Sequence, residues 1–172
     1  VKVGFPVALE RTFSCLGHVV FTSLVANLGT IAFAAHTIAL TAEEAFYIPG
    51  YGMQAAAATL SGNAVGASDN ARLKNITRTL LWLIVLIMVV SGSLLFLNAS
   101  FIMSIFTKDS DVIHLGTTVL KMVAISEPVF GIAVILEGIF NGVGDTLIPF
   151  IISLSCMWGI RIFLTYLCIH FW

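Results

Sequence analysis

Three long stretches of this chain contain no Asp, Glu, Lys or Arg, and this limits the possible folds more than any other feature. They cover residues 12–42, 45–68 and 79–107. Each is long enough for a helix that crosses the hydrocarbon of a bilayer, which takes about 20 mostly apolar residues. Over the whole chain 59% of residues are apolar and 10% charged, whereas a soluble domain carries about a quarter charged residues. The sequence therefore predicts an all-α polytopic membrane protein.

Glycine, proline and short polar residues divide the chain into five predicted transmembrane helices. Gly29 fits the end of the first helix, and Pro49 followed by Gly50 predicts a bend in the second. The segment 98–111 is predicted to be an interfacial loop. The predicted spans are about residues 5–28, 30–64, 70–98, 112–140 and 147–171.

Lysine and arginine near helix ends predict the orientation in the membrane. Arg72, Lys74 and Arg78 follow the second helix, whereas the turn after the first helix has no basic residue. Because cytoplasmic loops are enriched in basic residues, loop 66–78 is predicted to be cytoplasmic in a multi-pass protein of the cell membrane. The chain starts without Met and ends in an apolar segment, so we expect a piece of a longer polypeptide.

Several function classes are disfavoured. The net charge of -1 offers no basic surface for nucleic acid. The three cysteines lie in apolar stretches without a C-x-x-C pair, which disfavours a disulfide scaffold and a metal site. Motifs of soluble enzymes are absent from the sequence, so we expect no catalytic residues and no resident cofactor.

Polar residues inside the predicted spans are the candidate functional residues, because charges are costly there. On the first helix, Glu10 and His18 belong to a stripe with a spacing of four residues. The stripe fits a water-filled path for protons or a cation. It equally fits a Glu10 at the cytoplasmic interface and a His18 that hydrogen-bonds a neighbouring helix.

The second helix places His36, Glu43 and Tyr47 on one face. Glu43 lies about 20 Å along this helix at 1.5 Å per residue, deep in the bilayer. A carboxylate there needs a proton, a cation or water, so Glu43 is predicted to exchange a proton. The alternative is a neutral acid in a structural hydrogen bond between helices.

The last two predicted helices also carry deep ionisable residues. Glu127 precedes Pro128 near the middle of the fourth helix, and Arg161 lies deep in the fifth. Arg161 fits either a structural salt bridge or a contact with substrate. Lys121 could pair with an acid or extend its stem towards the interface.

Several short motifs have an order and spacing found in one transporter family. They are Gly4-Phe5-Pro6, Ala34-Ala35-His36-Thr37, Pro49-Gly50-Tyr51-Gly52, Gly62-Asn63-Ala64-Val65-Gly66-Ala67, Phe106-Thr107-Lys108-Asp109 and Gly142-Val143-Gly144-Asp145-Thr146. With these motifs the chain resembles the second half of the multidrug and toxic compound extrusion (MATE) family. The acid at Glu43 is most similar to the DinF-like branch.

The resemblance implies that residues 1–172 form part of the C-terminal lobe of a two-lobe exporter with twelve helices. The N-terminal lobe of the same polypeptide would then be a partner, beside the bilayer and a small-molecule substrate. Such proteins exchange organic cations or amphipathic drugs for H⁺ or Na⁺ by alternating access. The deep acids that hold sodium in some members have no counterpart here, so that site is not carried over.

Within this resemblance, Glu43 is predicted to face the central cavity and respond to protonation, helped by His36 and Glu127. Two alternatives are a flippase of lipid-linked sugars with related architecture and a membrane assembly subunit that transports nothing. A flippase would carry more cationic residues along its cavity. An assembly subunit would tolerate substitution of its deep acids.

Overall fold

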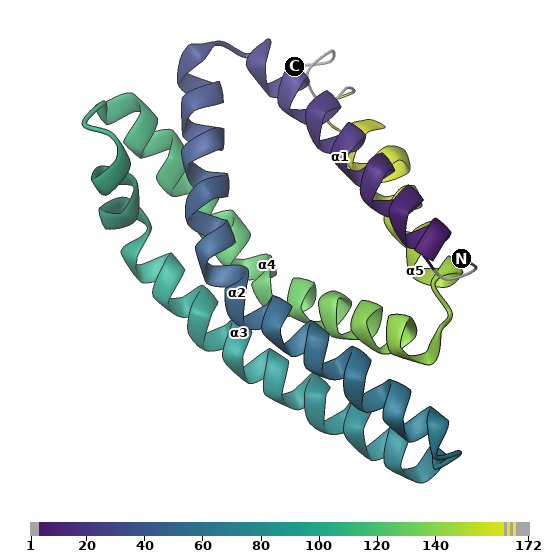
Figure 1. Cartoon of the computed structure of the whole chain (residues 1–172). Coiled ribbons are helices and arrows are strands. Elements are labelled where there is room, and N and C mark those ends of the chain that lie inside the picture. Colours follow the sequence, from purple (N-terminus) through teal and green to yellow (C-terminus); the bar gives the residue numbers. More distant parts are fainter. Residues whose placement is uncertain (1–3, 164, 166, 168–172) are drawn as a thin grey trace. The chain divides into compact units, whose positions relative to one another are not determined.

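The computed structural model describes residues 4–163, 165 and 167, with side chains from residue 8 onward except at 10 and 11. The described residues form helices and no strand, which confirms the all-α prediction. The elements are α1 (Gly4–Ala26), α2 (Thr30–Gly66), α3 (Asn70–Phe106), α4 (Ser110–Val143), α5 (Leu147–Leu154) and the π-helical η1 (Ser155–Ile162) (Figure 1).

The predicted loop at 98–111 is wrong. α3 continues through Phe106, and only residues 107–109 separate it from α4. The polar Asn98 does not end the helix, because its amide donates to the Leu94 carbonyl one turn earlier. Asp109 then starts α4 by accepting hydrogen bonds from the amides of Asp111 and Val112.

The last predicted helix differs in its regularity. α5 ends at Leu154 and the chain continues as the π-helical η1, which the hydrophobic pattern does not predict. The end of the predicted span, at residues 168–171, lies outside the described residues. At the other end of the chain, Gly29 has φ +108° after α1, as expected for a glycine at a helix end.

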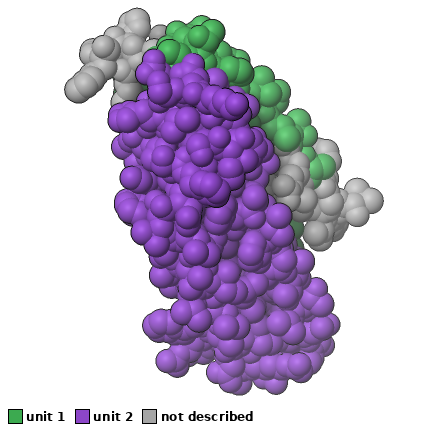
Figure 2. Space-filling view, turned by 90° about the vertical axis from the view of Figure 1, so that its left-hand side faces the viewer, with its two compact units in different colours: residues 1–33, 144–172 green, residues 34–143 purple. Residues whose placement is uncertain are grey.

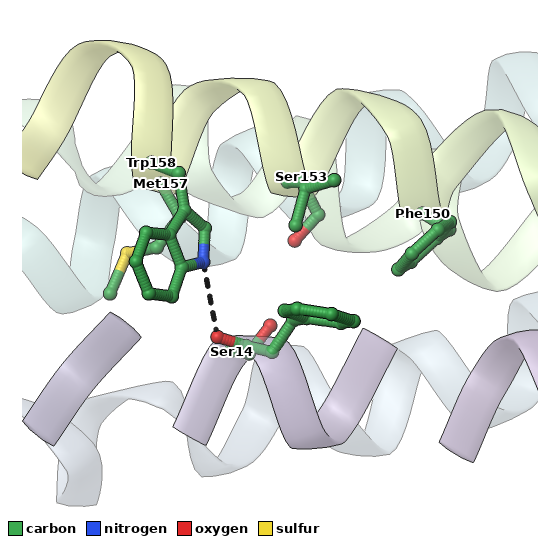
Figure 3. Close-up of a pocket in the computed structure, with 7 residues that line it drawn as sticks. Ser14, Phe150, Ser153, Met157 and Trp158 are labelled. Atoms are coloured by element: carbon green, nitrogen blue, oxygen red, sulfur yellow. Dashed lines mark hydrogen bonds between the residues drawn. The ribbon is translucent and has the colours of Figure 1, made fainter. Parts of the chain in front are cut away.

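The chain divides into two compact units, residues 1–33 with 144–172 and residues 34–143 (Figure 2). In the first unit α1 packs on α5 and η1. The Trp158 indole N–H donates to the Phe13 carbonyl at 3.3 Å, and Ser14 and Ser153 line the narrow gap beside it (Figure 3). Gly17 lets Met157 approach α1 closely. The contacts between these helices thus include the Trp158 hydrogen bond and the packing of the Phe13 ring on the Phe150 ring.

The second unit is a three-helix assembly of α2, α3 and α4 with two apolar clusters. One cluster lies towards the α3–α4 loop and the other towards the α2–α3 turn. The first contains Ala35, Ala39, Ala42, Leu95, Ala99, Met103, Val112, Leu120 and Ala124. The second contains Ala57, Leu80, Ile84, Met88 and Ile135. Alanine is frequent in α2 because small residues let helices approach closely in lipid.

The closest approach of α2 and α4 depends on glycines of α4. A Cβ atom on Gly142 would lie 2.1 Å from the Ser61 Oγ and 2.2 Å from the Ala58 carbonyl oxygen. Ser61 Oγ donates within α2 to Ala57 and reaches the Ile139 carbonyl of α4 at 3.3 Å. Glycine at 142 therefore lets backbone approach backbone where a larger residue would separate the two helices.

Two of these helices contain an internal proline and bend midway (Figure 1). Pro49 in α2 and Pro128 in α4 each remove a backbone donor from their helix, which explains a bend. Met88 of α3 fills the space left by two nearby glycines: its side chain lies against both Gly50 of α2 and Gly131 of α4. The bend predicted at Pro49 of α2 is therefore accompanied by a second bend at Pro128 of α4.

Two helices in the described part of the chain meet a length and hydropathy criterion for membrane spans, α3 and α4. α3 also presents a row of exposed apolar side chains, which includes Leu86, Leu97 and Phe101. Such a surface in water would be unfavourable over this length, and it suits hydrocarbon. The fold is that of an all-α membrane protein.

Candidate functional site

A polar layer separates the two apolar clusters of the second unit. The clusters stop at Ala42 and resume at Ala57 on α2, and they leave similar gaps on α3 and α4. Glu43, Ser91 and Glu127 lie in these gaps, one on each helix. Glu127 lies about 25 Å along α4, which is about 51 Å long at 1.5 Å per residue. The layer is therefore near the middle of the membrane.

Tyr47 connects α2 to α4 within this layer. Its hydroxyl donates to the Glu43 carboxylate one helical turn earlier. Its ring stacks on Phe130 of α4 at 4.3 Å between centroids, with the planes 24° apart, and Tyr51 packs against it edge-on. Phe130 lies one turn from Glu127, so the same contact brings the Glu43–Tyr47 pair towards the Glu127 carboxyl group. Tyr47 and Glu127, and likewise Glu43 and Glu127, are close enough to interact electrostatically.

Glu127 is completely buried, with 0% of its surface exposed. Neither of its carboxyl oxygens has a hydrogen-bond partner among the described residues. Ser91 of α3 lies near enough to offer its hydroxyl, but that hydroxyl donates to the Phe46 carbonyl at 3.3 Å. Gly92 brings the α3 backbone against this site, since a Cβ there would lie 3.5 Å from the Glu127 Cβ.

This arrangement can hold a proton or a single cation. An unpaired carboxylate in a dry interior is costly, so Glu127 must bind a proton or have a positive charge beside it. A nearby Glu43 carboxylate adds to that requirement, because two negative charges close together repel each other. No cluster of three or more His, Cys, Asp or Glu residues suitable for a metal ion occurs in the described part of the chain.

The structure brings together some of the predicted site residues and leaves others apart. Glu43 and Glu127 lie in one layer, whereas His36 is half-buried on α2 about 10 Å before Glu43 at 1.5 Å per residue. His18 and Arg161 belong to the first unit, where both are exposed. Arg161 lies over the Phe21 ring at 4.3 Å, a cation–π contact. Glu10 is on α1, but its side chain lies outside the described residues.

Two further residues of the layer carry no signal in the sequence. Phe130 is one of 13 phenylalanines, and nothing in its spacing indicates that it stacks on Tyr47. Ser91 lies in an apolar stretch where serine also fits simple helix packing. Their roles depend on which faces of α3 and α4 meet α2, and the hydrophobic pattern leaves this open because these helices are apolar on most sides.

Comparisons with known proteins identify the family. The MatE family model matches residues 6–167. The probable multidrug resistance protein NorM of Thermotoga maritima is 28% identical over 94% of this chain, and YoeA of Bacillus subtilis is 23% identical over 99%. The solved structure of a MOP superfamily transporter from Pyrococcus furiosus has a TM-score of 0.88 over 96% of the chain at 15% identity, which shows a shared fold. The chain spans 35% to 37% of the length of these three proteins, about a third. The predicted resemblance is thereby confirmed: this chain belongs to the MatE family of membrane transporters.

Proposed function

We propose that this chain is part of an ion-coupled exporter that moves small organic cations or amphipathic drugs across the cell membrane by alternating access. The observation that supports this most is the buried Glu127 carboxyl group, which has no hydrogen-bond partner among the described residues. It lies beside the Glu43–Tyr47 pair in the middle of three apolar helices. A protein without a cationic substrate or coupling ion would gain stability by an apolar residue at this position.

The coupling follows from competition for the acidic layer. A proton on Glu127 removes its negative charge, so the acidic layer can be shielded from water at a lower cost in free energy. Loss of the proton leaves a negative charge that an organic cation or Na⁺ can neutralise. Since proton and cation offset the same charge, binding of one favours release of the other, and the exchange of the two is thermodynamically linked.

The names of two relatives agree with multidrug export, and the structure of a third agrees with a role of pocket charge in substrate choice. NorM and YoeA are named probable multidrug resistance proteins. The transporter from Pyrococcus furiosus is described as having a binding pocket of reverse polarity, which suggests a different function for it. We propose that the acids of this chain select positively charged substrates.

The orientation that we propose has residues 66–78 in the cytoplasm. Arg72, Lys74 and Arg78 are all exposed at the start of α3. Exposed cations at this end fit the enrichment of basic residues on the cytoplasmic side.

Efflux of a fluorescent organic cation from proteoliposomes tests the proposal with the intact protein. Glu127→Gln and Glu43→Gln each remove an ionisable group from the layer, and both should reduce efflux driven by a proton gradient at least tenfold. Glu44→Gln is the matched control, because Glu44 is the neighbouring acid and is exposed. The control should keep the activity of the natural sequence.

The pH dependence separates the proposal from its alternatives. Efflux by the natural sequence should change between about pH 6 and about pH 8, and both layer variants should lose that change. If Glu127→Gln and Glu43→Gln keep the activity and the pH dependence of the natural sequence, the coupling role is contradicted. Absence of efflux by the natural sequence itself would favour a subunit that transports nothing. Repeating the assay with a sodium gradient identifies the coupling ion.

A further inference from the structure

The seam between α3 and α4 contains two hollows that are lined by different types of residue. One, the polar hollow, has a volume of about 450 Å³, lies near the α3–α4 loop and is lined by polar residues and Ile113, although most of the surface that they expose is apolar. The other has a volume of about 370 Å³ and is mostly apolar. The polar hollow is lined by Ser100, Ser110, His114, Thr117, Thr118 and Lys121. The apolar hollow is lined by Val89, Phe96, Leu97, Ala124, Ile125 and Pro128.

Lys121 and Phe96 join the two hollows. The Lys121 ammonium of the polar hollow lies 5.6 Å from the centre of the Phe96 ring, which belongs to the apolar hollow. The seam therefore offers one cation and the exposed residues Ser100 and Ser110 at one end of an apolar trough, as an amphipathic anion would require.

The surroundings of the apolar hollow suit lipid. Leu97 is 78% exposed, Ile125 72% and Val129 70%, so both edges of the hollow present large apolar side chains. Water around such edges would be unfavourable. Acyl chains can cover them at no cost in hydrogen bonds.

The position of Lys121 along α4 fits a headgroup contact. α4 has 34 residues and is about 51 Å long, about 20 Å more than the hydrocarbon thickness of about 30 Å. With this excess shared by both ends, Lys121 lies about 6 Å inside the hydrocarbon edge, since it is about 16 Å from the start of α4. A lysine stem can carry its ammonium group across that depth to the headgroup region.

The attraction of the seam for an anion comes from Lys121. Lys121 stands in the polar hollow, and the positive end of the α4 helix dipole is at Ser110. The two acids that flank Ser110, Asp109 and Asp111, offset this dipole, and Asp109 accepts the amides of Asp111 and Val112. Neither Asp109 nor Asp111 lines the hollow.

We propose that this seam is a binding site for one anionic phospholipid. Its phosphate would lie in the polar hollow at Lys121 and the hydroxyl residues, and one of its acyl chains would lie in the apolar hollow. The site takes a lipid rather than free phosphate, because the trough beyond Phe96 has no other polar lining than Ser93. Ser93 is itself satisfied by the Val89 carbonyl.

Native mass spectrometry of the intact protein in detergent tests this with three probes: phosphatidylglycerol, phosphatidylcholine and inorganic phosphate. Phosphatidylglycerol should bind about fivefold more tightly than phosphatidylcholine, as expected for one basic residue at a membrane surface. Lys121→Met should remove this preference, and Lys121→Arg should keep it. Lys108→Met is the control, because Lys108 is exposed in the neighbouring loop and lines neither hollow.

A second pair of variants tests the apolar hollow. Ser93→Trp should fill it and weaken binding of both lipids at least fivefold, whereas Ser104→Trp, on the same helix but outside both hollows, should not. An unchanged preference in Lys121→Met overturns the proposal, and so does equal lipid binding in Ser93→Trp. Binding of inorganic phosphate as tight as that of phosphatidylglycerol would also overturn it, since the acyl chain would then contribute nothing.

Discussion

Replacement of Gly142 by alanine gives the sharpest test of how α2 and α4 meet. The new Cβ would lie 2.2 Å from the Ala58 carbonyl oxygen, whereas ordinary contact begins at 3.4 Å. The shortfall of 1.2 Å (3.4 minus 2.2) is against backbone, which cannot rotate away as a side chain can. The two helices must therefore separate or shift at this crossing.

The energetic cost has two parts. Overpacking of a close contact typically destabilises a protein by about 1–3 kcal/mol. Separation also removes the approach of Ser61 Oγ to the Ile139 carbonyl, and such a hydrogen bond between membrane helices contributes about 0.6 kcal/mol. We expect Gly142→Ala to lower the free energy of unfolding by about 1.5–3.5 kcal/mol.

Unfolding of the intact protein by SDS in mixed micelles, followed by tryptophan fluorescence, measures this difference. Gly52→Ala is the control, because its Cβ would meet nothing within 4 Å and α2 is already helical there. The control should be as stable as the natural sequence or slightly more stable. If Gly142→Ala unfolds at the same SDS fraction as Gly52→Ala, the close backbone approach inferred for α2 and α4 is incorrect.

Three other predictions concern the acidic layer and the orientation. Glu127→Met should raise the free energy of unfolding by about 1–3 kcal/mol while abolishing proton-driven efflux, because it removes an unsatisfied buried group; lower stability in SDS unfolding would contradict this. Tyr47→Phe should keep its stack on Phe130 and its stability but alter the pH dependence of efflux, since Glu43 loses a donor; an unchanged pH profile argues against that role. A cysteine at Ser68, in the exposed turn before α3, should react with an impermeant maleimide only from the cytoplasmic side, and labelling from outside would reverse the orientation.

The sequence predicts the helices well where breaks in the apolar pattern are strong and less well where they are weak. Gly29 and the turn at 66–70 mark real helix ends. Asn98 does not, because its side chain finds a partner within its own helix and the apolar residues resume after it. The π-helical η1 has no counterpart in the pattern, since a π-helix depends on how the chain packs rather than on local composition.

The candidate site was predictable only in part. The depth of Glu43 and Glu127 follows from counting residues along apolar helices, and Pro128 marks the middle of α4. The meeting of these acids in one layer does not follow, because it requires knowing which faces of α2 and α4 are in contact. Tyr47 shares a face with Glu43 in sequence, but its stack on Phe130 is a tertiary contact.

Met88 allows the packing between α2, α3 and α4 to adapt to a change in helix angle. The Met88 side chain occupies the space left by two glycines, Gly50 and Gly131, each of which follows the proline of its bent helix. An unbranched thioether with three rotatable bonds can follow either helix as the angle between them changes. The angle between α2 and α4 can therefore change without opening a void, because the Met88 side chain can adopt another rotamer. A β-branched residue at this position has fewer rotamers and would favour one angle.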